Sequence, residues 1–393
     1  MIIIGANFMG DIFLTCEEVE FRQRVREFCK REIAPLSDLI EKMGDYPREI
    51  LRKMGREGFL KVHHRVESGG TGKGLSYEVI LAEEVSAVSA STEMSRLASV
   101  TLYGMPISRF GTIEQKRTYL APVLLGEKIG ALGITEPDVG SDVAGMKTRA
   151  EKDGEDYSIN GEKRFITNGS IADFLVVFAI TNPEAHAHKG MSAFIVESSQ
   201  PGFEVVKDFE LMGMRGARVA HLKFNNLRVP NENLLGKENA GFSVLMDELD
   251  SERTAIAAGM VGTARAAYEV AVKYSTDRVQ FDVPIRQFEG VSFKVAEMAV
   301  KIEAARLLTL RAARMIDNGS RATKEAAMAK LYATEAAVDV TNDALQVLGG
   351  IGYSKEYPVE RYVRDARLMT IGGGTSEIMK YLIQREVYKE FGL

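Results

Sequence analysis

The chain changes its residue pattern twice, and the order of these changes constrains the fold more than any other feature. Up to about residue 125, apolar residues such as Phe21 and Val25 recur at helical spacing, behind a Thr15–Glu18 capping box. Near Gly130 the pattern changes to short alternating runs, and after Gly241 it becomes helical again. We therefore expect a helical region, a β region and a second helical region in this order.

Two dipeptides in the middle region are typical of tight β-hairpin turns. These are Asp153–Gly154 and Asn160–Gly161. Runs rich in β-branched and aromatic residues follow, separated by Gly, Asn and Pro, at 175–180, 192–197, 203–206 and 219–224. The sequence therefore predicts a small antiparallel β domain, which ends near Pro230.

The last region is dominated by long alanine-rich stretches. Helices are expected over 254–274, 291–318 and 323–348, and Pro284 is the only proline between 231 and 357. Three or four such helices, antiparallel and closely connected, make a bundle. The predicted fold class is α+β, with an N-terminal α-helical domain (1–127), a β-sheet domain (128–236) and a C-terminal four-helix-bundle domain (237–393).

Composition excludes several partners. The 393 residues carry 50 basic and 55 acidic side chains, a net charge of −5, which disfavours nucleic acid or an anionic membrane as the main partner. The longest apolar runs, such as 174–180, are too short to span a bilayer, and Met1–Phe13 lacks the features of a signal peptide. Cys16 and Cys29 are the only cysteines, and we expect both to be reduced in a cytoplasmic protein.

Several common chemistries can be set aside from the motifs alone. The chain has no GxxxxGK[ST] loop and no HExxH motif, and the glycines at 349–352 follow a helix instead of a strand. Its histidine pairs, His63–His64 and His186–His188, fall in segments that read as polar loops without matching ligands. We therefore expect no metal site.

Two motifs in the middle region carry the clearest signal for a ligand. Residues 133–142 read Gly-Ile-Thr-Glu-Pro-Asp-Val-Gly-Ser-Asp, and 165–169 read Phe-Ile-Thr-Asn-Gly. Pro137 and Gly140 favour a strand that opens into a polar loop, whose backbone N–H groups and hydroxyls can meet an anionic or heteroaromatic ligand. From the first motif alone, an ordinary hairpin loop is an equal alternative.

Five ordered motifs resemble those of the acyl-CoA dehydrogenases, and the resemblance extends from about Thr15 to the C-terminus. They are the two motifs above, Asp277-Arg-x-x-Phe281, Gln346-Val-Leu-Gly-Gly350 and Gly372-Gly-Gly-Thr-Ser-Glu-Ile378. The resemblance implies an FAD cofactor, an acyl-CoA substrate, an electron-transfer flavoprotein as acceptor and a homotetramer built as a dimer of dimers.

The same resemblance assigns residues to the cofactor. Phe165 stands where many relatives have Trp, and its aromatic face should still stack on the flavin. Arg278 should meet the FAD of a neighbouring subunit, because its guanidinium suits a pyrophosphate; a solvated charge at a helix end is the alternative. Glu289 replaces a Gln that often contacts the flavin. The expected FAD-binding residues are Leu132, Ile134, Thr135, Ser141, Phe165, Ile166, Thr167, Arg278, Phe281, Phe288, Gln346, Val347, Gly349, Gly350, Thr375 and Glu377.

The reaction of the family needs a carboxylate, which removes the proton α to a thioester carbonyl while a hydride leaves the β carbon for flavin N5. Many relatives place this Glu directly before Gly-Thr-Ser/Asn-Glu, where the present chain has Gly373. Glu252, in Asp247-Glu-Leu-Asp-Ser-Glu-Arg253, matches the position used by the long-chain and isovaleryl members, and is the predicted base. The alternative is that Glu252 belongs to a set of acids favoured at a helix N-terminus.

The resemblance also points to substrate contacts: Ser141, Asp250, Arg253, Gly373, Gly374 and Glu93. The backbone N–H of Gly373 could bond the thioester oxygen. Arg253 could instead pair with Glu248 or Glu252, and Thr375 could serve as a helix cap. Glu93 stands where the glutaryl-CoA branch has an Arg, so it could favour a hydroxylated or cationic acyl tail; a surface helix charge is the alternative.

The sequence therefore predicts an FAD-dependent acyl-CoA dehydrogenase that converts a saturated acyl-CoA to the 2-enoyl-CoA. Two alternatives remain open at this point. One is a family flavoenzyme of different chemistry, such as an oxidase, a desulfinase or a cyclic acyl-CoA dehydrogenase. The other is a catalytically silent FAD- or acyl-CoA-binding protein, because the usual base position is Gly373.

Overall fold

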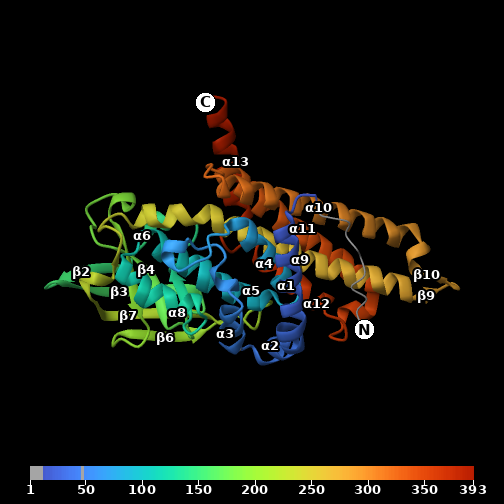
Figure 1. The fold of residues 1–393 in the computed structure, drawn as a ribbon, viewed down its shortest axis with the longest axis horizontal. Coiled ribbons are helices and arrows are strands. Elements are labelled where there is room, and N and C mark those ends of the chain that lie inside the picture. Colours follow the sequence, from blue (N-terminus) through green and yellow to red (C-terminus); the bar gives the residue numbers. More distant parts are fainter. Residues whose placement is uncertain (1–11, 46–47) are drawn as a thin grey trace.

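The computed structural model describes residues 12–45 and 48–393, which form a helical region, a β-sheet region and a second helical region along the chain (Figure 1). The predicted order is thus confirmed. Most of the Met1–Phe13 segment lies outside the described residues, as does Pro47, the predicted start of the second helix. None of the helices in the described ranges is both long and apolar enough to cross a membrane.

Short helices make up the N-terminal region. The predicted capping box is present, because Thr15 Oγ1 accepts from the Glu18 backbone N–H and the Glu18 carboxylate accepts from the Thr15 N–H. The helices are α1 (Cys16–Phe28), α2 (Ser37–Met43), α3 (Arg48–Arg56), α4 (Leu75–Ser86), α5 (Ala90–Leu97), α6 (Gly104–Phe110), α7 (Ile113–Gln115) and α8 (Ala121–Leu124), with π-helical turns at Cys29–Ile33, Ala98–Tyr103 and Lys116–Leu120.

The middle region is one sheet of eight strands. Its strands are β1 (Gly130–Gly133), β2 (Arg149–Asp153), β3 (Asp156–Thr167), β4 (Phe174–Ile180), β5 (Met191–Glu197), β6 (Phe203–Asp208), β7 (Val219–Val229) and β8 (Leu234–Leu235). They run in the order β6-β7-β3-β2-β4-β5-β8, and β1 pairs with β4. Most pairings are antiparallel, as predicted, but β1–β4 and β2–β4 are parallel.

Only one of the two predicted hairpin turns exists. Asp153 pairs with Asp156 across a two-residue turn that contains Gly154, so the first prediction is correct. The second is wrong, because Gly161 lies inside β3 at a register shift against β7. A Cβ on Gly161 would lie 2.5 Å from Thr148 Oγ1, and this close approach explains the glycine.

The C-terminal region is built on three long helices, α9 (Gly241–Asp277), α10 (Glu289–Asp317) and α11 (Thr323–Leu348). The predicted start of the first at 254 is wrong, because α9 begins at Gly241 and its 37 residues extend over about 55 Å. A small hairpin, β9 (Val279–Gln280) and β10 (Val283–Pro284), joins α9 to α10.

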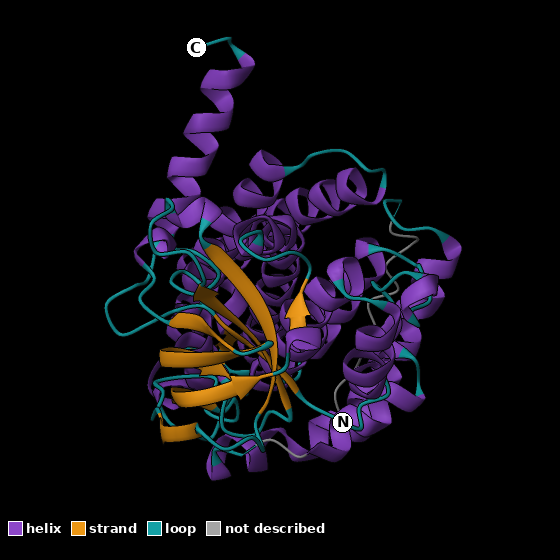
Figure 2. Cartoon of the chain, turned by 90° about the vertical axis from the view of Figure 1, so that its left-hand side faces the viewer, coloured by secondary structure: helices purple, strands orange, loops and turns teal. Residues whose placement is uncertain are grey.

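Two further helices complete the region, α12 (Val359–Leu368) and α13 (Ser376–Glu390). Helix α13 packs on α11, its later residues Glu386 and Glu390 pair with Arg321 and Lys324, and the C-terminus of the chain projects outward in both views (Figures 1 and 2).

Helix α9 connects the three regions. Its first residue, Gly241, packs so closely on β5 that a Cβ would lie 2.7 Å from the Ser192 carbonyl carbon. Farther along, α9 packs against α4 and against α10 and α11. The carboxylate of Asp317, at the end of α10, accepts from the Leu75 and Ser76 N–H groups at 2.6 and 2.9 Å, and so caps the N-terminus of α4.

Candidate active site

The two motifs of the middle region lie side by side. The Arg164 N–H donates to the Thr135 carbonyl at 2.7 Å, and Lys163 Nζ donates to the Ile134 carbonyl at 3.1 Å. The loop after β1 leads to β2, but these two strands do not pair with each other. Within the loop, Glu136 and Val139 form an isolated antiparallel bridge, so the hairpin alternative describes residues 136–139 but not a pairing of β1 with β2.

A buried ion pair fixes this loop. Glu136 accepts from Lys163 Nζ at 2.9 Å and from the N–H groups of Lys147 and Thr148 at 2.6 and 3.0 Å. Burial raises the pKa of Glu136, but the Lys163 charge and these hydrogen bonds outweigh it, so the pKa lies below its usual value. The carboxylate therefore stays ionised and holds the loop in one conformation.

Phe165 combines a strained backbone with an exposed ring. Its φ is +58°, which a bulky residue rarely adopts, and its side chain is 54% exposed. The ring packs on Phe209 with centroids 4.6 Å apart, and the Arg164 guanidinium lies over both rings. Strain of this kind is typical of functional sites.

Asn168 ties the second motif to the N-terminal helices. Its φ is +65°, and its side-chain amide donates to the carbonyls of Ser95 and Gly130 at 2.9 and 3.2 Å. Asn168 Oδ1, Ser170 Oγ and Arg164 Nε are buried and have no hydrogen-bond partner within the part of the chain that the structure describes. Buried polar atoms are normally satisfied, so these fit a ligand that carries its own donors and acceptors, as a flavin ring does.

The other residues of the two motif segments that are assigned to FAD differ in solvent exposure. Leu132, Ile134, Thr135 and Thr167 are half-buried, and Ser141 is exposed. Ile166 is only 3% exposed and packs in the sheet core, so its backbone, not its side chain, remains for a ligand.

The predicted base lies beside the glycine that replaces the usual one. A Cβ built on Gly373 would be 3.4 Å from Glu252 Oε1 and would collide with Ile256 Cδ1. Gly373 has φ +64° and Gly374 has φ +93°, values that favour glycine. The carboxylate of Glu252 therefore reaches the space that a side chain at 373 would enter, although it comes from another helix.

Burial dominates the chemistry of Glu252. The residue is 8% exposed, and burial raises the pKa of its carboxyl, while Arg253 and Lys330 lower it. No donor among the described residues forms a hydrogen bond with this carboxylate. A raised pKa suits a general base that works near neutral pH.

Glu248, one turn earlier on α9, is even more isolated. It is 3% exposed, and neither carboxylate oxygen has a hydrogen-bond partner among the described residues. Burial raises its pKa well above the usual value, and the Arg109 charge opposes this only partly because Arg109 binds Asp247. The alternative that the acids of 247–252 merely favour a helix start does not fit, since α9 begins at Gly241 and Glu248 and Glu252 are buried.

Arg253 pairs with neither of the two acids expected from the sequence. Its Nη1 donates to Asp250 Oδ1 at 3.3 Å, and Asp250 also accepts from Thr323 Oγ1 at 2.7 Å. Arg253 is 7% exposed, and its Nε has no partner among the described residues. A donor thus remains free at the position predicted to contact the substrate.

Glu93 is not a surface charge, so that alternative is wrong. It is 4% exposed, and its two oxygens accept from Arg96 Nη2 and Nε at 2.7 and 2.9 Å. Arg96 also donates to Glu78 at 2.6 Å, and Glu78 accepts from Thr101 Oγ1 at 3.3 Å. We call Glu78, Glu93, Arg96 and Thr101 the paired cluster.

The remaining cofactor residues lie at the other end of the molecule. Arg278 caps the C-terminus of α9, about 39 Å from Glu252 along the helix axis. The ends of α10 and α11 meet there, because Lys294 pairs with Asp343 at 2.6 Å (Figure 1). This end carries Arg278, Phe281, Phe288, Gln346, Val347, Gly349 and Gly350, of which Phe281 is 88% exposed and Val347 is buried.

Thr375 has the capping role that its position allows. It is the N-cap of α13, and its Oγ1 accepts from the Ile378 N–H at 3.3 Å. Glu377 is exposed in the first turn of the same helix.

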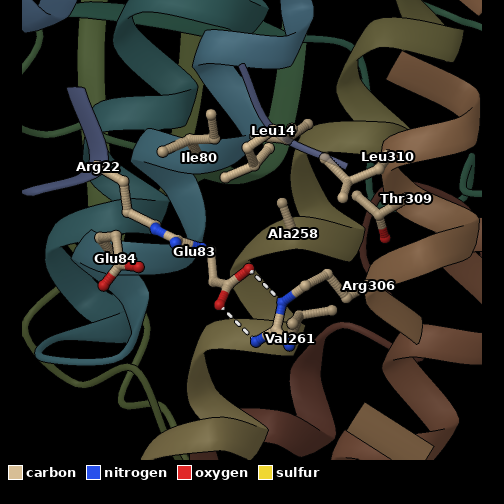
Figure 3. A pocket seen from close by; sticks show the side chains of 11 residues that line it. Leu14, Arg22, Ile80, Glu83, Glu84, Ala258, Val261, Arg306, Thr309 and Leu310 are labelled. Atoms are coloured by element: carbon tan, nitrogen blue, oxygen red, sulfur yellow. Dashed lines mark hydrogen bonds and ion pairs between the residues drawn. The ribbon is translucent and has the colours of Figure 1, made fainter. Parts of the chain in front are cut away.

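Two features elsewhere are structural. His64 lies in a loop, as predicted, but its side chain is not in a polar surface segment, since it is 1% exposed and its Nε2 lies 2.9 Å from the Val100 carbonyl oxygen. A recess between α4, α9 and α10 holds about 20 Å³, room for about one water molecule, and Figure 3 shows Glu83 in it pointing to Arg306. Although burial opposes it, the charges of Arg306 and Arg265 lower the pKa of Glu83 to about 2.

Sequence reasoning missed Lys330, Glu248, Arg96 and Asn168. Arg96 could have been found, because it follows Glu93 at the i, i+3 spacing of helical ion pairs. Lys330 and Glu248 give no such signal, since their surroundings depend on how separate helices pack.

Comparison with known proteins agrees with this geometry. Models of the acyl-CoA dehydrogenase N-terminal, middle and C-terminal domains match residues 15–127, 131–227 and 239–388. An acyl-CoA dehydrogenase of Bacillus subtilis (strain 168) is 42% identical over 372 residues, which cover 95% of this chain and 98% of that protein.

Two solved structures are also similar. Butyryl-CoA dehydrogenase from Megasphaera elsdenii superposes with a TM-score of 0.92 at 37% identity, covering 95% of this chain and 99% of that one. A chain from a structure titled for the electron transferring flavoprotein of Acidaminococcus fermentans has a TM-score of 0.93 at 41% identity and covers 95% and 98%.

The protein therefore belongs to the acyl-CoA dehydrogenase family. It is an FAD-dependent oxidoreductase of fatty acid metabolism that acts on acyl-CoA thioesters.

Proposed function

We propose that the protein converts a short, saturated acyl-CoA to the 2-enoyl-CoA, with Glu252 as the base that takes the α-proton. The single observation that carries this proposal is the position of Glu252 Oε1, next to the Cβ site of Gly373. The short acyl chain is supported by the similar structure named as a butyryl-CoA dehydrogenase.

The surroundings of Glu252 suit this task. An α-proton of a thioester is a weak acid, so a buried carboxylate with a raised pKa is a stronger base than an exposed one. The Gly373 N–H is a candidate donor to the thioester oxygen, where negative charge develops as the proton leaves. Bound FAD would supply the hydride acceptor for this reaction, beside the residues assigned to the flavin.

Each FAD would be held by residues of two protomers. Phe165 would face the isoalloxazine, with Leu132, Ile134, Thr135, Ser141, Ile166, Thr167, Thr375 and Glu377 around the same cofactor. Arg278 is too far along α9 to reach it, so the hairpin end would serve the FAD of a neighbouring subunit. This division supports a homotetramer arranged as a dimer of dimers.

Substrate contacts and location complete the proposal. Arg253, with its unpaired Nε, and Asp250 would bind the CoA-bearing part of the substrate, together with Ser141 and Gly374. Both carboxylate oxygens of Glu93 already accept hydrogen bonds from Arg96, so any contact of Glu93 with the acyl tail would have to coexist with these bonds. We place the enzyme in the cytoplasm, since both cysteines are free. An electron-transfer flavoprotein would be its acceptor.

Replacement of the base tests the proposal. Glu252→Gln should lower butyryl-CoA turnover by about 10²–10⁴-fold, the usual contribution of a general base, while the protein stays yellow with FAD. The measurement is anaerobic bleaching of the flavin in a stopped-flow instrument. Glu248→Gln is the matched control, one turn earlier on α9, and should keep most of the turnover.

Other outcomes would point elsewhere. Retained bleaching in Glu252→Gln would contradict the base assignment. Rapid re-oxidation of the bleached wild type by air would indicate an oxidase, and no bleaching by any of a panel of acyl-CoA esters would indicate a binding protein. The same panel determines the preferred chain length.

A further inference from the structure

Lys330 is a completely buried lysine in the middle of α11. It is 0% exposed, and its Nζ donates to the Gly374 carbonyl at 2.5 Å. A buried ammonium without an ion pair is costly, and no carboxylate of the described residues lies within ion-pair distance of it. Such a residue requires a reason beyond packing.

The carbonyl that Lys330 holds belongs to the turn beside Glu252. Gly373 and Gly374 both have positive φ, so this turn has no regular helical or strand bonding of its own. The space between the turn and α9 is narrow, because a Cβ on Gly373 would collide with Ile256. The distance between the turn and the Glu252 carboxylate therefore depends on what fixes the Gly374 carbonyl.

We propose that Lys330 is a positioning residue for the base: its ammonium anchors the Gly373–Gly374 turn against Glu252 and keeps that carboxylate ionised. This inference rests on the proposed function, in which Glu252 takes the α-proton. Lys330 itself has no role as a proton acceptor in it.

The charges around the two groups support this arrangement. The pKa of Lys330 is lowered to about 8, mainly by burial. Three carboxylates oppose this lowering and favour the charged form: Glu252, Glu335 on α11 and Glu377 on α13. Arg253, on α9, disfavours the charged form.

Glu252 has two cationic neighbours. Arg253 and Lys330 lower its pKa, but the Arg253 guanidinium donates to Asp250, and the remaining titratable neighbour on α9 is Glu248. Below its pKa the carboxyl is protonated and cannot accept the α-proton. Loss of the Lys330 charge raises this pKa further, so the low-pH side of the activity profile moves to higher pH.

Two variants separate the anchor from the charge. Lys330→Met removes both, whereas Lys330→Gln can still donate to the Gly374 carbonyl but carries no charge. We expect both to shift the low-pH limb of kcat/KM for butyryl-CoA to higher pH, with a larger loss of plateau kcat in Lys330→Met. Lys330→Arg should return the limb towards its wild-type position. Lys294→Met, which removes a lysine–aspartate pair between α10 and α11, is the control and should keep the wild-type limb.

A second readout needs no turnover. Acetoacetyl-CoA has a ketone at its β carbon, so no hydride can leave, but its acidic α-proton can pass to the base. The absorbance of the bound enolate should appear at higher pH in Lys330→Gln than in the wild type. FAD content and melting temperature, measured on the same samples, exclude loss of fold as the cause.

The outcomes distinguish this inference from the proposed function. If the low-pH limb is unchanged in both Lys330→Met and Lys330→Gln, the inference about Lys330 is overturned. If Glu252→Gln is inactive in the same experiments, the assignment of Glu252 as the base still stands. If Glu252→Gln turns over normally, the base assignment fails instead, and a shifted limb in the lysine variants then reports on another acid.

Discussion

Two groups among the buried carboxylates of the described residues are built in opposite ways. In the paired cluster, Arg96 donates to both Glu78 and Glu93 at 2.6 to 2.9 Å. In the second group, which we call the open group, Glu248 and Glu252 are buried without an ion pair among the described residues. Lys330, nearby, binds a backbone carbonyl instead.

The difference shows what each group is for. A buried charge is tolerated when it is paired, and the paired cluster joins α4 to α5 in this way. Burial raises the pKa of Glu248 and Glu252, and it also raises the pKa of Glu93 in spite of Arg96, whereas Arg96 brings the pKa of Glu78 below its usual value. What distinguishes Glu248 and Glu252 is therefore the absence of an ion pair among the described residues, which costs stability but leaves their oxygens free to accept a proton. Both acids of the open group cost stability, but only Glu252 lies beside Gly373 and is assigned the proton transfer. Three substitutions test this contrast.

The largest effect is expected in the paired cluster. Arg96→Met leaves Glu78 and Glu93 buried without an ion pair, which should cost about 3–5 kcal/mol of unfolding free energy. Urea unfolding of the FAD-loaded protein measures it. Arg311→Met breaks an ion pair with Glu325 in which the arginine is 54% exposed, and should cost about 0–1 kcal/mol. Equal losses in the two variants would remove the distinction.

An intermediate effect is expected at the turn beside the base. Gly373→Ala places a Cβ against Ile256 at φ +64°, a conformation that costs a non-glycine residue about 1–2 kcal/mol. Because the turn must move away from Glu252, turnover should fall more than stability does. Gly58→Ala is a matched control, since φ there is +78° and a Cβ would meet nothing within 4 Å. A normal kcat in Gly373→Ala would show that the turn does not position the base.

The smallest effect, and one of opposite sign, is expected for Glu248→Gln. The raised pKa of Glu248 means that its contribution to stability is complete at low pH and is lost as the pH rises through the folded-state value. Gln cannot ionise, so the variant should be as stable as the wild type in acid and more stable at alkaline pH. Melting temperatures across this range measure the difference. A variant less stable at every pH would mean that Glu248 has a partner that requires its charge.

The fold could be predicted well where the signal was local. The capping box at Thr15, the turn at Gly154 and the third long helix, α11, agree with the structure because each depends on neighbouring residues. The turn predicted at Asn160–Gly161 is absent, since the same dipeptide is compatible with a tight turn and with a register shift where another segment approaches closely. The early start of α9 was missed because residues 241–253 lack the alanine-rich pattern that marked the helix.

The site could be predicted only in part. The structure places the two motif loops side by side and Glu252 next to Gly373, and the roles assigned to these residues stay predictions. Lys330 could not be found, because which lysine of an alanine-rich helix turns inward depends on its packing against α9 and α13. The alternative pairing of Arg253 with Glu248 or Glu252 was wrong, although its partner Asp250 lies at the local i, i+3 spacing of helical ion pairs.

The crowding at Gly373 also has an evolutionary consequence. Moving the carboxylate from position 252 to position 373 requires a side chain where Ile256 now lies, on a backbone with φ +64°. No single substitution accomplishes this, because a lone change either removes the acid or creates a steric clash. The two arrangements are thus separated by an epistatic barrier, because the acid and the residues around position 373 must change together.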